Sequence, residues 1–200
     1  MPLYKSITHS TGARVWIWNI TESEDYLREP IQLTANSTSR LVSMRDALHR
    51  KGFLSIRHLL ALAGYTDFDL YYDSNGKPHL TDGQHISITH SFEFTAIIIA
   101  DFPVGIDIEK IRPKVDRIAV KFIKYESLPE NDEARYERLT QIWCIKESVY
   151  KLLSTPGLSF KRNVYVGDDS TTCIYEANTY LFNQEFEPLP GFMCGYIVPA

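Results

Sequence analysis

The sequence predicts an α+β fold in two halves. Strand-like and helix-like segments follow in the order strand, helices, strands, and this order occurs once on each side of Pro103. Neither half shows the regular alternation of strands and helices that builds a doubly wound parallel sheet. No linker-like segment separates the halves. We therefore expect two domains, residues 1–103 and 104–200.

The first half is expected to begin with a strand and a helical region. Residues 13–20 alternate apolar and polar side chains, which is typical of a strand, and residues 21–24 resemble a capped helix start. An amphipathic pattern over residues 39–62 predicts one bent helix or two, because Gly52 weakens its middle. Gly64 is the predicted helix stop.

The strands that follow are expected to pair as hairpins. Asn75-Gly76 is a strong hairpin-turn signal, and residues 85–91 and 94–100 each have a strand pattern. The second half opens with a strand over residues 105–109. Helices are predicted over residues 115–125 and 132–153, and strands over residues 163–166, 173–175, 180–182 and 195–198.

Composition and charge exclude several classes of protein. No apolar run approaches the roughly 20 residues that span a bilayer, and the first residues show no signal pattern. A net charge of −4 argues against nucleic-acid binding. Cys144, Cys173 and Cys194 are odd in number and lack metal-ligand spacing, so we expect reduced, mostly buried thiols in a cytoplasmic protein.

Acidic residues on one strand and one helix suggest a metal site. Side chains alternate along a strand, so Asp107 and Glu109 share one face while the isoleucines beside them point into the core. Glu147 and Lys151 lie one turn apart on the same side of a predicted helix. If these carboxylates come together, they form an all-oxygen pocket that suits a hard divalent cation, above all Mg²⁺.

Each of these residues also has an ordinary structural explanation. Alternating acids are common on a solvated strand face, and a Glu–Lys helical pair contributes roughly 0.2–0.5 kcal/mol without any function. His90 alone suggests a structural histidine, and Lys77 alone suggests a solvated turn lysine. Their joint occurrence in this order favours phosphoryl transfer at a diphosphate site.

Together these segments resemble the 4′-phosphopantetheinyl transferase superfamily, in its larger, surfactin-synthetase-activating type. The specific motifs are Gly-x-Asp-x-Glu at residues 105–109 and Trp-x-x-Lys-Glu-x-x-x-Lys at residues 143–151. Residues 76–78 and 88–91 resemble the Gly-Lys-Pro and Ser-His-Ser segments of the family, with Thr89 in place of serine, and residues 49–57 resemble its basic helix. The resemblance implies two similar α+β halves that form a pseudo-dimer in one chain, and therefore a monomer.

The implied reaction is the Mg²⁺-dependent transfer of 4′-phosphopantetheine from coenzyme A to a serine of an apo acyl or peptidyl carrier protein, releasing adenosine 3′,5′-bisphosphate. Asp107, Glu109 and Glu147 would hold Mg²⁺, with Mn²⁺ as an alternative. Glu147, or a water that it orients, would act as the base, with Lys151 and Lys146 as further catalytic residues. Coenzyme A contacts are expected, mainly from the first half, at Lys51, Arg57, Lys77, Thr89, His90 and Lys151.

Two alternatives stay open. The chain resembles an enzyme but would also fit a relative that binds coenzyme A or carrier protein without catalysis, or a different metal-dependent phosphotransferase. A basic stretch over residues 110–124, with Asp116 as its single acid, follows the acidic strand. We expect it to attract an acidic carrier protein, and the alternative is a solvated helix face.

Overall fold

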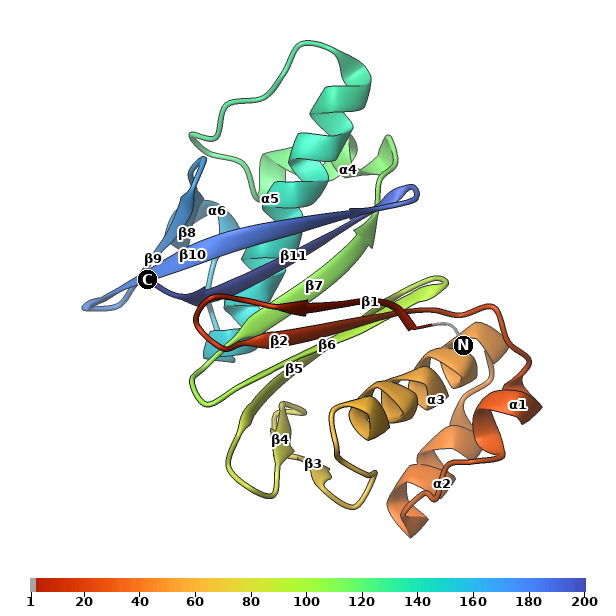
Figure 1. Ribbon diagram of the computed structural model, residues 1–200. Coiled ribbons are helices and arrows are strands. Elements are labelled where there is room, and N and C mark those ends of the chain that lie inside the picture. Colours follow the sequence, from red (N-terminus) through yellow and green to blue (C-terminus); the bar gives the residue numbers. More distant parts are fainter. Residues whose placement is uncertain (1–2) are drawn as a thin grey trace. The chain divides into compact units, whose positions relative to one another are not determined.

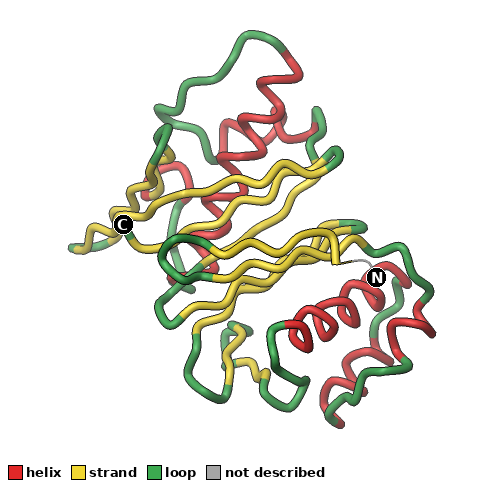
Figure 2. The backbone as a smooth tube through the Cα atoms, in the orientation of Figure 1, coloured by secondary structure: helices red, strands yellow, loops and turns green. Residues whose placement is uncertain are grey.

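The computed structural model describes residues 3–200. They form two compact units that divide after Phe102, which we call unit 1 and unit 2. Each unit combines an antiparallel sheet with helices, so the predicted α+β class is confirmed (Figure 1, Figure 2). None of the helices within residues 3–200 is long and apolar enough to cross a membrane.

Unit 1 is built on a four-stranded sheet in the order β1-β2-β6-β5. Its strands are β1 (Leu3–Thr8), β2 (Arg14–Asn19), β5 (His85–Ser91) and β6 (Phe94–Ala100). The sequence pattern predicted the last three strands closely. It missed β1 because this edge strand is largely exposed and carries no clear apolar alternation.

The helices of unit 1 are α1 (Glu24–Arg28), α2 (Ala35–Ser43) and α3 (Ala47–Leu62). The predicted break at Gly52 is wrong, because the chain leaves its helix at Met44 and Asp46 caps the new one through the His49 N–H at 2.9 Å. Gly52 lies inside α3, where a Cβ would meet the His90 ring at an ordinary 3.8 Å. Packing therefore outweighs the low helix propensity of this glycine.

One face of the unit 1 sheet packs against α3. Ile97 and Ile99 of β6 and Trp16 and Trp18 of β2 share a buried cluster with the apolar side of α3. A hairpin of β3 (Leu70–Tyr72) and β4 (Pro78–Leu80) follows, and its turn holds Gly76 at a φ of 81°, as the Asn-Gly signal predicted.

Unit 2 has a five-stranded sheet in the order β7-β11-β10-β9-β8. Its strands are β7 (Gly105–Lys110), β8 (Val164–Val166), β9 (Ser170–Tyr175), β10 (Asn178–Leu189) and β11 (Phe192–Pro199). Its helices are α4 (Lys114–Ile118), the 3₁₀ turn η1 (Ala119–Lys121), α5 (Asp132–Leu153) and α6 (Phe160–Asn163). The long helix α5 lies against β7 and β11 (Figure 1).

The helix α5 has the predicted boundaries, because Asn131 caps its start and Ser154 ends it in a left-handed conformation. The helix predicted over residues 115–125 stops earlier, at Lys121. The Glu126 carboxylate accepts hydrogen bonds from the N–H groups of Lys124 and Tyr125, so these residues form a turn instead. The three cysteines are free and buried, as predicted.

Candidate functional site

Two glycines allow α5 to lie directly against the sheet of unit 2. A Cβ on Gly105 of β7 would lie 2.1 Å from the Ser148 carbonyl oxygen, and one on Gly195 of β11 would lie 2.9 Å from Cys144 Cβ. Ser148 Oγ donates hydrogen bonds to the carbonyls of Cys144 at 2.8 Å and Gly195 at 3.0 Å. Helix and sheet are therefore in backbone contact at this point.

Asp107 and Glu109 lie on the face of β7 that meets α5. They alternate with Gly105, so all three residues share that face. Lys151 Nζ donates to Asp107 Oδ1 at 2.7 Å and to the Ile106 carbonyl at 3.0 Å. The Trp143 indole donates a hydrogen bond to the Glu109 carboxylate. Ile106 and Ile108 are buried core residues, so the prediction that the neighbouring isoleucines point into the core is confirmed.

Trp143, Glu147 and Lys151 follow one side of α5 at intervals of four residues, which places them one turn apart. This side runs antiparallel to β7, since Lys151 meets Asp107 and Trp143 meets Glu109. Glu147 therefore lies between the two contacts. The sequence analysis quoted Trp143 only as part of the family motif and gave it no role at the site.

The three carboxylates are buried enough to perturb one another. Burial raises the pKa of Glu147 to about 7, the negative charge of Asp107 adds to this, and Lys151 opposes it. Burial likewise raises the pKa of Glu109, followed by the charge of Asp107, while the Trp143 hydrogen bond, Arg112 and Lys151 oppose the shift. A bound cation would relieve this mutual repulsion of the carboxylates.

The donor set fits a hard divalent cation in its chemistry. Within residues 3–200, no three His, Cys, Asp or Glu side chains are gathered closely enough to hold a metal ion. Asp107 is instead neutralised by Lys151. Closure of the three carboxylates around a metal therefore stays a prediction.

Replacing Glu147 by glutamine should stabilise the metal-free protein at about pH 8. The folded-state pKa lies above the ordinary value, so the stability linked to this group is complete below about pH 4.5 and is lost as the pH rises through about 7. Glu147→Gln avoids that loss, and we expect a gain of about 1–3 kcal/mol at pH 8 that vanishes near pH 4. Urea unfolding with a metal chelator measures it.

The exposed Glu137 on the same helix provides the control, because Glu137→Gln should change the free energy of unfolding little at either pH. Equal stability of Glu147→Gln and wild type at pH 8 would contradict the buried-charge account.

Lys146 is not part of this group. It is 0% exposed, and it ion-pairs with the Glu126 carboxylate. Its Nζ also donates to the carbonyls of Phe122 at 2.6 Å and Phe160 at 3.1 Å. Successive residues diverge by about 100° around a helix, so adjacency to Glu147 in sequence does not place Lys146 beside it. These contacts give Lys146 a structural part, which is to hold the 122–126 turn against α5, and its catalytic role stays a prediction.

Breaking this buried ion pair should be costly. Lys146→Met leaves the Glu126 carboxylate buried without its cation, so we expect a loss of about 3–5 kcal/mol in the free energy of unfolding. Adding Glu126→Gln removes the stranded charge and should recover part of that loss. Urea unfolding of both single variants and the double variant gives the coupling energy, and additive effects would contradict the assignment.

Unit 1 gathers a second group of predicted residues around a pocket of about 230 Å³. His90 lines this pocket and its ring meets that of His49 edge-on, with centroids 5.7 Å apart. Arg40 lies over the Tyr72 ring at 5.1 Å and also lines the pocket. The sequence analysis included His49 only as the first residue of the basic helix segment, and it missed Arg40, a polar helix residue without a motif of its own.

Arg57 lines the same pocket but its guanidinium is occupied. It is 3% exposed, and its Nε donates to Asp67 Oδ1 at 2.9 Å. Its other nitrogens reach the Phe53 carbonyl at 3.2 Å and Ser37 Oγ at 3.3 Å. A bidentate phosphate contact by Arg57 would have to break these bonds, so Arg40 is the more accessible cation in this pocket.

The remaining predicted residues of unit 1 are not among those that line this pocket. Thr89 is buried and points to the face of β5 opposite His90, since neighbouring residues of a strand alternate. Lys51 is half-buried in α3. Lys77 ends the β3–β4 turn, where Asp73 Oδ1 accepts its backbone N–H at 2.9 Å. Burial lowers the pKa of the Lys77 ammonium, and the Asp73 charge opposes this.

Comparison with known proteins identifies the family. The family model of the 4′-phosphopantetheinyl transferase superfamily matches residues 103–188, which include β7 and α5. The 4′-phosphopantetheinyl transferase gsp of Aneurinibacillus migulanus is 30% identical over 169 residues, covering 78% of this chain and 70% of that protein. The 4′-phosphopantetheinyl transferase psf-1 of Bacillus pumilus is 33% identical over 94 residues, 44% of this chain and 40% of that protein.

The 4′-phosphopantetheinyl transferase Sfp of Bacillus subtilis is 28% identical over 127 residues, which are 58% of this chain and 57% of Sfp. The chain thus spans most of the first relative and only part of the other two. It belongs to the 4′-phosphopantetheinyl transferase superfamily, and the resemblance predicted from its motifs is confirmed. Its enzyme class is that of the 4′-phosphopantetheinyl transferases.

Proposed function

We propose that this protein transfers 4′-phosphopantetheine from coenzyme A to a serine hydroxyl of an apo acyl or peptidyl carrier protein and releases adenosine 3′,5′-bisphosphate. One observation carries the proposal. Asp107 and Glu109 of the Gly-x-Asp-x-Glu strand lie against the side of α5 that carries Glu147 and Lys151. Both family motifs therefore contribute to one acidic group in unit 2.

In this proposal Asp107, Glu109 and Glu147 hold Mg²⁺, or Mn²⁺ in its place, and the ion supplies positive charge for the diphosphate of coenzyme A. The Trp143 hydrogen bond orients Glu109 for this task. Lys151, released from Asp107, donates to a phosphate oxygen of the substrate. Glu147, or a water that it orients, is proposed to accept the serine proton.

Unit 1 is proposed to bind the nucleotide end of coenzyme A. The pocket at His90 supports this assignment, because Arg40 and His49 add hydrogen-bond donors beside the aromatic ring of Tyr72. The sequence alone supports a part in this binding for four further residues, Lys51, Arg57, Lys77 and Thr89. The pseudo-dimer relation of the halves, the monomeric state and the cytoplasmic location are further parts of the proposal.

Incubation with Mg²⁺, coenzyme A and an apo carrier protein tests the function. Transfer adds one phosphopantetheine arm to the mass of the carrier. Binding of coenzyme A without transfer would instead favour a non-catalytic relative, and cleavage of coenzyme A without a modified carrier would favour a different metal-dependent phosphotransferase.

Asp107→Asn should abolish the transfer, because it removes the carboxylate between Lys151 and the proposed metal. The amide nearly matches the carboxylate in size at this 6% exposed position, so the fold should be retained. Carrier mass spectrometry follows the activity and circular dichroism follows the fold. The exposed Asp132→Asn on α5 is the control and should stay active. A wild-type rate in Asp107→Asn contradicts the proposed metal site.

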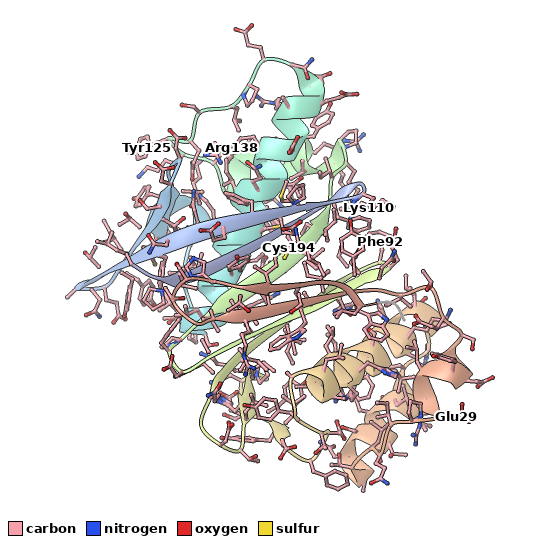
Figure 3. All side chains as sticks on the ribbon, viewed as in Figure 1. Glu29, Phe92, Lys110, Tyr125, Arg138 and Cys194 are labelled. Atoms are coloured by element: carbon pink, nitrogen blue, oxygen red, sulfur yellow. The ribbon has the colours of Figure 1, made fainter. Side chains whose placement is uncertain are left out.

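The basic stretch after β7 is proposed to attract the carrier protein. Lys114, Arg117 and Lys121 are exposed on α4 and η1. Lys110, at the end of β7 (Figure 3), lines a pocket of about 190 Å³ together with Glu109 and Trp143. Positive charge therefore borders the acidic group on the unit 2 surface.

Charge reversal of Lys114, Arg117 and Lys121 to glutamate should raise the KM for carrier about tenfold or more at low salt. The KM for coenzyme A and kcat should change little. High salt should reduce the difference in KM for carrier between the variant and the wild type, because it screens the electrostatic attraction. Arg162→Glu, an exposed reversal on α6, is the control. An unchanged KM for carrier at low salt leaves a solvated helix face as the explanation.

A further inference from the structure

Unit 1 contains a second pocket, of about 500 Å³, between α1, β2 and the last turn of α3. Trp18, Tyr26, Glu29, His58 and Leu62 contribute to its wall. It shares no lining residue with the pocket at His90. Its volume lies in the range of about 300–1,000 Å³ that is typical of small-molecule sites.

Aromatic rings form much of this wall. Trp18 is 5% exposed and packs on the His58 ring, with centroids 5.1 Å apart and an angle of 32° between the planes. Tyr26 is 56% exposed at the pocket rim. The faces of Trp and Tyr rings attract cations through their negative electron density. An occupant with a positive charge would therefore gain attraction beyond its apolar contact.

The charges around the pocket also favour a positively charged occupant. Glu29 places a carboxylate in the wall and lies at the surface beside α1 (Figure 3). The last turn of α3, which supplies Ala61 and Leu62, carries no basic residue, so the negative end of this helix is not neutralised from within. The basic residue nearest to Glu29 in sequence is Arg28. Its guanidinium donates a hydrogen bond to the Ile31 carbonyl at 2.6 Å.

Two polar groups define the rest of the ligand. The Trp18 indole N–H is buried without a hydrogen-bond acceptor among residues 3–200, and an oxygen acceptor on the occupant would satisfy it. His58 Nε2 is hydrogen-bonded to the Leu27 carbonyl at 2.9 Å, so this nitrogen carries a hydrogen. The imidazole is thereby fixed in place as a flat wall beneath Trp18.

We propose that this pocket binds a small organic cation, an alkylammonium or arylammonium group on an apolar body that also carries an oxygen acceptor. The exposed Tyr26 ring holds the cationic head against the wall that Trp18 and His58 form, and the Glu29 carboxylate balances its charge. The site does not depend on the transferase assignment, because it uses none of the residues proposed for that reaction.

Choline and its uncharged isostere 3,3-dimethylbutan-1-ol test the proposal, because they share size and hydroxyl group and differ in charge. Titration of the full-length protein is followed by the ¹H–¹⁵N signal of the Trp18 indole, assigned with Trp18→Phe. Choline should shift this signal and bind about fivefold or more tightly than the alcohol. Equal affinity for the two probes, or binding of neither, overturns the proposal.

Matched variants test whether the Glu29 charge and the Tyr26 ring contribute to choline binding. Glu29→Gln should weaken choline binding about fivefold and leave the alcohol unchanged. Asp25→Asn removes an exposed carboxylate of the same helix outside the pocket and should leave both affinities unchanged. Tyr26→Phe keeps the ring and should retain choline, whereas Tyr26→Leu should weaken it. Loss of affinity in Asp25→Asn equal to that in Glu29→Gln also overturns the proposal, because it indicates only a diffuse surface charge.

Discussion

The backbone contact between α5 and the sheet of unit 2 determines where the acidic residues lie. Gly105 has no space for a Cβ, because Ser148 of α5 occupies it. That close approach turns the next alternate residues of β7, Asp107 and Glu109, onto the helix and away from bulk water. Their burial, and the raised pKa of Glu147, follow from this one packing constraint. An ordinary side chain at Gly105 would separate the strand from the helix.

The same packing carries a cost in stability. Carboxylates that lie close together away from water repel one another, and Lys151 compensates this only in part. A fully buried ion pair between Lys146 and Glu126 lies on another side of α5. One side of α5 thus carries Glu147, whose pKa is raised, and another side carries Lys146, which is held in a buried ion pair. This division is typical of sites that maintain unfavourable charge for function.

The sequence was most informative where a local rule coincides with the tertiary structure. Strand alternation predicted the shared face of Asp107 and Glu109, and the helix pattern predicted both ends of α5. It failed where packing overrides local preference. Gly52 remains helical inside α3, Lys146 lies about 100° around α5 from its neighbour Glu147, and Arg57 is enclosed by Asp67. The accessible Arg40 and His49 enter the pocket only through the tertiary arrangement of α2 and α3.

A pair of glycine substitutions tests the central claim, that close approach of β7 to α5 builds the acidic group. Gly105→Ala places a Cβ 2.1 Å from the Ser148 carbonyl, whereas Gly52→Ala meets its nearest neighbours at 3.8 Å within a helix. Urea unfolding should show a loss of about 3 kcal/mol or more for Gly105→Ala and a neutral or slightly stabilising effect for Gly52→Ala. Phosphopantetheine transfer should be lost in Gly105→Ala. Wild-type stability and transfer in Gly105→Ala would contradict the account.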